Sequence, residues 1–119
     1  MQNYGNQSYG NITLKQATAY SSNTGYIQVA EAIGNDKIMS LVKKLGIDPA
    51  KDNIEDVPVM TLGTGSISPL EMASAYATFA NGGYYRQPIA ITEIDSRTGS
   101  VLYQHTDNPT QVLTEGEAA

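Results

Sequence analysis

The sequence contains no cysteine. Disulfides, thiolate catalysis and cysteine-ligated zinc are therefore excluded, although the absence assigns no cellular compartment. The single histidine, His105, has no second ligand near it at a spacing suited to a metal, so we expect an ordinary surface histidine there. We expect neither a metal nor any other cofactor.

Basic residues are also few, with 7 lysines and arginines against 12 acidic residues and a formal net charge of −5. The only basic doublet, Lys43-Lys44, lies in an expected helix and cannot follow a phosphate backbone, which argues against a nucleic-acid partner. No apolar run approaches the ~20 residues that span a bilayer, and no signal peptide is visible. A piece of a secreted or anchored protein would lack both features, so their absence decides little.

The remaining composition fits a globular chain, because 119 residues with 40% hydrophobic content can form one domain or part of a larger one. Apolar periodicity predicts helices at 13–20, 24–33, 36–45 and 69–80. The pairs Thr13/Gln16 and Ser68/Glu71 have capping-box spacing at two of the helix starts. The helix at 69–80 is apolar nearly all round, which predicts a buried helix.

After Pro88 the pattern changes to that of strands. Residues 89–94 and 100–104 are rich in β-branched and aromatic side chains and flank a turn at 95–99, so we expect a β-hairpin. The fold class is therefore α+β and mostly helical. We expect a single partial domain, residues 1–119, with a loop at 1–12, a helical region at 13–83, the hairpin at 84–105 and a connector at 106–119.

Two short patterns suggest nucleophilic-serine chemistry, in which a neighbouring base must take the serine proton. Ser40 and Lys43 form a Ser-x-x-Lys pair that could meet across one helical turn. However, Ser40 lies mid-helix, opposite the apolar stripe and far from helix-terminal N–H groups that could form an oxyanion hole, so we interpret the pair as a chance match. The second pattern, Ser21-Ser22-Asn23, is by itself only a polar turn between two helices.

The context of this triplet gives a resemblance to a known family. The order and spacing of several segments from about residue 9 onward resemble the transpeptidase domain of class A penicillin-binding proteins, and the block 62–83 is the most specific part. The segments are Ile12-Thr13-Leu14-Lys15-Gln16-Ala17, Ser21-Ser22-Asn23-Thr24, Leu62-Gly63-Thr64-Gly65, Ser68-Pro69-Leu70-Glu71-Met72-Ala73, Ala75-Tyr76, Phe79-Ala80-Asn81-Gly82-Gly83 and Pro88-Ile89-Ala90-Ile91.

The resemblance implies the mostly helical part of a bacterial transpeptidase domain plus one hairpin. The implied activity is a serine-type D,D-transpeptidase that cross-links peptidoglycan stem peptides, binds β-lactams and works at the extracytoplasmic face of the cell membrane. Ser21 would hydrogen-bond the catalytic lysine and relay protons to the leaving group. Asn23 would hydrogen-bond the stem peptide or the side-chain amide of a β-lactam.

Two of the family's three catalytic elements are missing from the sequence. The nucleophilic Ser-x-x-Lys element would lie upstream of residue 1, and the Lys-Thr-Gly strand would follow residue 119; residues 62–65 only echo the latter. We therefore expect an internal piece that is inactive alone. Two alternatives stay open, a non-catalytic domain that binds stem peptides and a helical interaction module.

Overall fold

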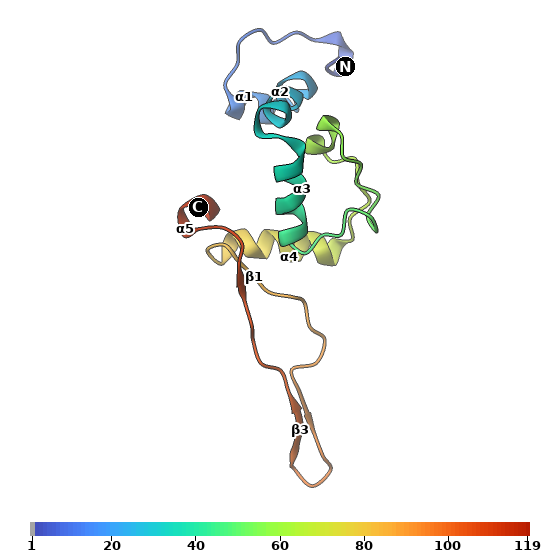
Figure 1. Ribbon diagram of the computed structural model, residues 1–119, viewed down its shortest axis with the longest axis vertical. Coiled ribbons are helices and arrows are strands. Elements are labelled where there is room, and N and C mark those ends of the chain that lie inside the picture. Colours follow the sequence, from blue (N-terminus) through green and yellow to red (C-terminus); the bar gives the residue numbers. More distant parts are fainter. Residues whose placement is uncertain (1) are drawn as a thin grey trace. The chain divides into compact units, whose positions relative to one another are not determined.

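The computed structural model describes residues 2–119, which divide into two compact units. The first unit contains the chain up to residue 43 together with residues 48–67, and the second contains residues 44–47 and 68–119. Five α-helices, two 3₁₀ helices and four short strands follow one another along this part of the chain (Figure 1). The predicted α+β class is confirmed.

In the first unit, α1 (Leu14–Ala19) begins with the expected capping box. The Thr13 hydroxyl accepts a hydrogen bond from the Gln16 amide at 3.3 Å, and the Gln16 side chain accepts one from the Thr13 amide at 2.9 Å. These two bonds satisfy donors that the first helical turn would leave open. The helix has six residues, so neighbouring segments must hold it in place, because such a short helix is not stable alone.

The next two helices follow closely. Helix α2 (Asn23–Ile33) begins one residue earlier than predicted, because Ser22 acts as its N-cap, and it ends at Gly34 with φ of 94°. Helix α3 (Asn35–Lys44) follows directly. The predicted boundaries of both helices are therefore correct to within a residue, as Ser and Gly are strong start and stop signals.

The interior of the first unit is small. Helix α2 packs against the 3₁₀ helix η2 (Pro58–Leu62), with Ala30 fully buried and Met60 8% exposed. Ala17 of α1 is buried as well. Small side chains at these contacts let the elements approach closely but bury little apolar area, so this unit gains a modest hydrophobic stabilisation.

In the second unit, α4 (Pro69–Ala80) begins at the predicted capping box, in which the Ser68 hydroxyl accepts from the Glu71 amide. The prediction that this helix is buried all round is wrong for this chain. Ala75 and Thr78 are buried, whereas Leu70 and Tyr76 remain 63% and 69% exposed. Within the described residues of this unit, α4 packs mainly on β1 and α5, which cover only one of its faces.

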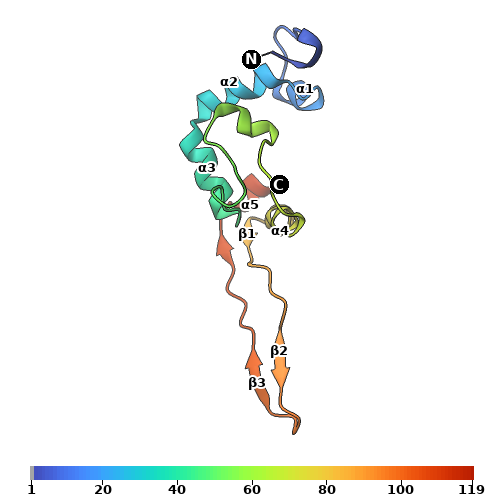
Figure 2. The same cartoon turned by 90° about the vertical axis from the view of Figure 1, so that its right-hand side faces the viewer.

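Two antiparallel strand pairs complete the second unit (Figure 2). Strand β2 (Glu93–Asp95) pairs with β3 (Val101–Gln104), as the predicted hairpin requires, although the strands are shorter than predicted. The sequence did not predict the pair of β1 (Tyr84–Tyr85) with β4 (Thr110–Gln111). Two-residue strands are too short to show a period, so only tertiary contact reveals them.

Gly83 joins the end of α4 to the returning chain. Its carbonyl accepts hydrogen bonds from the amides of Val112 at 2.8 Å and Leu113 at 3.2 Å. Its φ is 92°, and a Cβ here would overlap the Leu113 carbonyl. Only glycine permits this close approach, after which α5 (Glu115–Ala118) returns to α4.

Candidate functional site

The Ser21-Ser22-Asn23 triplet forms the turn between α1 and α2. Ser21 is exposed and has a φ of 48°, in the left-handed region. Its amide donates to the Thr18 carbonyl at 3.1 Å, and the Ser22 amide donates to the Ala17 carbonyl at 2.9 Å. A left-handed conformation costs a residue other than glycine about 1–2 kcal/mol, so the turn holds Ser21 in a geometry that serine does not favour.

The middle residue of the triplet has the opposite environment. Ser22 is 1% exposed, and its hydroxyl accepts from the Gly25 amide at 3.2 Å. The same hydroxyl donates to Oδ1 of Asn3 at 3.3 Å. Ser22 is therefore a buried cap of α2 that faces the interior while Ser21 faces solvent.

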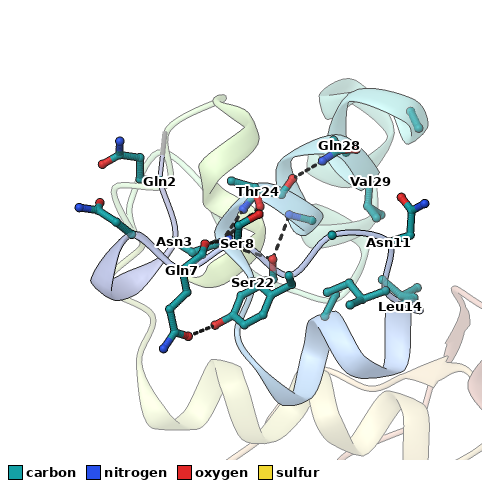
Figure 3. A pocket seen from close by; sticks show the side chains of 17 residues that line it. Gln2, Asn3, Gln7, Ser8, Asn11, Leu14, Ser22, Thr24, Gln28 and Val29 are labelled. Atoms are coloured by element: carbon teal, nitrogen blue, oxygen red, sulfur yellow. Dashed lines mark hydrogen bonds between the residues drawn. The ribbon is translucent and has the colours of Figure 1, made fainter.

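The N-terminal segment contacts this turn through two amide groups (Figure 3). Asn3 is 7% exposed, and its Oδ1 accepts from the Thr24 amide at 3.1 Å. The Asn23 side chain donates from Nδ2 to the Gln2 carbonyl at 3.0 Å. Sequence reasoning placed residues 1–12 in a loop and missed this contact, because a polar segment without a period carries no signal for a tertiary partner.

A groove of about 660 Å³ lies between the N-terminal segment and the helices α1 and α2 (Figure 3). Side-chain amides and hydroxyls dominate its wall, and Ser22 and Asn3 contribute to it, whereas Ser21 and Asn23 do not. The structure therefore brings Ser21 and Asn23 together on one turn but places them outside the groove. Their proposed roles stay predictions.

The other serine pattern gains nothing from the structure. Ser40 and Lys43 are both exposed in the body of α3, as expected for a chance match. Among residues 2–119, no three histidine or acidic side chains gather closely enough to hold a metal ion. No helix in the same range is long and apolar enough to cross a bilayer.

Comparison with known proteins decides the family. The model of the penicillin-binding protein transpeptidase domain matches residues 1–115. The chain belongs to this family. The match includes the turn between α1 and α2, the capped start of α4 and the β2–β3 hairpin, so the resemblance in the sequence is confirmed over nearly all of the chain.

Named relatives are class A penicillin-binding proteins. Penicillin-binding protein 1A of Pseudomonas aeruginosa is 37% identical over 92% of this chain and 13% of its own length. Penicillin-binding protein 1A of Aquifex aeolicus is 33% identical over 97% of this chain and 15% of its own length. The crystal structure of penicillin-binding protein 1A from Haemophilus influenzae gives a TM-score of 0.75 at 28% identity, over 92% of this chain and 16% of that one. The chain thus spans about one seventh of the length of these relatives.

Proposed function

We propose that the chain is part of a serine-type D,D-transpeptidase that cross-links peptidoglycan stem peptides and binds β-lactams at the extracytoplasmic face of the bacterial membrane. The active serine would attack the D-Ala-D-Ala carbonyl of one stem peptide and release the terminal D-Ala. An amine of a second stem peptide would then displace the serine from the acyl-enzyme. The observation that carries this proposal is the strained, exposed Ser21 in a chain matched by the transpeptidase family along its length.

Ser21 suits a role in proton relay. Within the described residues its hydroxyl has no hydrogen-bond partner, so it can bond to a lysine supplied by another part of the domain. Glycine would fit the left-handed backbone at lower cost, which indicates that the hydroxyl is the reason for a serine here. Asn23 donates one amide hydrogen to Gln2, and its remaining N–H and Oδ1 are available to a stem peptide.

The nucleophile and the Lys-Thr-Gly strand would come from the rest of the domain. Residues 1–119 would then form one partial domain with the loop, helical region, hairpin and connector boundaries given above, and the rest would cover the exposed apolar side of α4. The chain by itself should be inactive, because a relay serine without a nucleophile cannot form an acyl-enzyme.

The test measures the second-order rate of acylation by penicillin in the full-length protein that contains this chain. Ser21→Ala should slow acylation by about 10²–10⁴-fold, the usual contribution of one positioned acid–base group. Asn23→Ala should cost about 1.5–3 kcal/mol, because a substrate group would be left unpaired. Ser40→Ala is the control and should leave the rate unchanged.

A wild-type rate for Ser21→Ala would remove the proposed relay. If the full-length protein binds stem peptides but never forms a covalent penicillin adduct, it is a non-catalytic binding domain. If it binds neither ligand, the helical interaction module remains as the explanation of the triplet.

A further inference from the structure

We propose that Asn3 is a positioning residue for the transpeptidase site, which it serves by fixing the geometry of the Ser21-Ser22-Asn23 turn. The inference rests on the proposed function, since it assumes that Ser21 and Asn23 act on the substrate. It assigns a role to a segment, residues 2–8, that the sequence gave no reason to connect with catalysis.

The Asn3 side chain is the centre of a buried hydrogen-bond network (Figure 3). Its Oδ1 accepts from the Ser22 hydroxyl at 3.3 Å, and from the Thr24 amide and hydroxyl at 3.1 and 3.3 Å. Its Nδ2 donates to the Gln7 carbonyl at 2.9 Å and to the Thr24 hydroxyl at 3.1 Å. Both ends of the amide are therefore used, and a side chain without them would leave several buried groups unpaired.

This network completes the capping of α2. The first N–H groups of a helix have no partner inside the helix. The Ser22 hydroxyl takes the Gly25 amide, and Asn3 takes the Thr24 amide, so each oxygen satisfies a different donor. Because Asn3 also holds the Ser22 hydroxyl, it fixes the rotamer of the cap as well as the first turn of the helix.

The turn needs such a support for a physical reason. Ser21 pays the cost of a left-handed backbone, and a strained residue persists only where its surroundings hold it. On one side the turn is attached to α1, which has only six residues and little rigidity of its own. The Asn3 network supplies the fixed point on the other side, directly after Ser21.

Asn3 also helps to place the second residue of the site. Its bond to the Gln7 carbonyl closes residues 3–7 into a compact loop around η1 (Tyr4–Asn6). The residue before that loop, Gln2, presents its carbonyl to Nδ2 of Asn23. Orientation of the Asn23 amide therefore depends on the same loop that Asn3 holds together.

The test uses the full-length protein and measures the rate constant of penicillin acylation for molecules that still become labelled. Asn3→Ala should lower this constant by about 10–100-fold, because a displacement of about 1 Å at a reacting group can cost 10²-fold. Asn3→Asp should stay within about 3-fold of wild type, since its carboxylate can accept the same three bonds and a negative charge is favourable at the start of a helix. The exposed Asn11→Ala is the matched control and should have no effect.

A role in stability alone would give a different result. It would lower the melting temperature and the fraction of labelled molecules while leaving the rate constant of the labelled ones unchanged. A double-mutant cycle adds a second criterion: in a Ser21→Ala background, Asn3→Ala should change the rate constant less than 3-fold, because it acts through Ser21. If Asn3→Ala does not fold, Asn3→Gln replaces it and should also be slow, since its amide is displaced by one methylene.

Wild-type rate constants for both Asn3→Ala and Asn3→Gln, with a slow Ser21→Ala, would overturn the positioning role and leave the proposed function intact. An Asn3→Asp as slow as Asn3→Ala, or effects that multiply fully in the cycle, would overturn it as well. A wild-type rate for Ser21→Ala would instead end the proposed function, and this inference with it.

Discussion

The two adjacent serines of the turn should respond in opposite ways to substitution. Ser22→Ala removes the cap of α2, which costs about 0.5–2 kcal/mol at a typical helix start. The lost hydroxyl also leaves the Gly25 amide without its acceptor, while Asn3 keeps its bonds to Thr24. We therefore expect Ser22→Ala to lower the free energy of unfolding by about 1–2 kcal/mol.

Ser21→Gly should be neutral or stabilising. The substitution relieves the left-handed conformation, worth about 1–2 kcal/mol. Glycine returns part of this, about 0.5–1 kcal/mol, through the larger freedom of its unfolded backbone. The net change in the free energy of unfolding should lie between about 0 and +1 kcal/mol from these two terms. Ser21→Ala keeps the strain and removes no intramolecular bond, so it should match wild type.

The assay is urea unfolding of the 119-residue chain, followed by circular dichroism. Equal slopes against denaturant across the variants are required before the midpoints are compared, because a changed slope signals a changed end state. The predicted order of stability places Ser21→Gly at or above wild type and Ser22→Ala below it. A Ser21→Gly variant less stable than wild type, or a Ser22→Ala variant equal to it, would refute the assignment of strain to one serine and capping to the other.

Three further outcomes follow from the structure. The 119-residue chain should take up no fluorescent penicillin covalently, and a labelled serine found by mass spectrometry would contradict this. Gly83→Ala should destabilise the chain more than Gly99→Ala in the same unfolding assay: both glycines have positive φ, which costs alanine about 1–2 kcal/mol, but only at Gly83 does a Cβ meet backbone. Finally, the backbone and side chain of Thr114 donate to Glu117 and hold the pKa of this carboxyl below its usual 4.5, so its stabilisation of α5 is present above pH 4.5 and is lost as the pH falls through the lowered pKa. Chemical shifts of residues 115–118 during an acid titration measure that loss, and Thr114→Ala should raise the pKa of Glu117.

Local chemistry made several features predictable. The capping boxes at Thr13 and Ser68 lie where the sequence places them, because a hydroxyl and an acceptor three residues apart satisfy each other's neighbours without any outside partner. The glycine stop at Gly34 and the strand–turn–strand pattern of the hairpin are equally local. The family itself was also visible in the sequence, since the spacing of its segments is written along the chain.

The burial of α4 could not be predicted in this way. Its apolar circumference indicates that every face is made to be covered, but covering requires neighbours. In the described part of the chain those neighbours reach the face of Ala75 and Thr78 and leave Tyr76 open. Periodicity states what a helix can bury, and only the contacts present in a given chain decide what it does bury.

The sequence by itself determined the helices, their caps, the hairpin and the family, because these depend on residues within a few positions of one another or on motif spacing. Tertiary structure alone decided the pairing of Tyr84-Tyr85 with Thr110-Gln111 and the contact of Asn3 with the Ser22 cap. Asn3 and Ser22 are 19 positions apart and share no pattern. Such contacts arise when the folded chain pairs every buried donor and acceptor, a condition that acts on the whole molecule and leaves no trace in any short window of sequence.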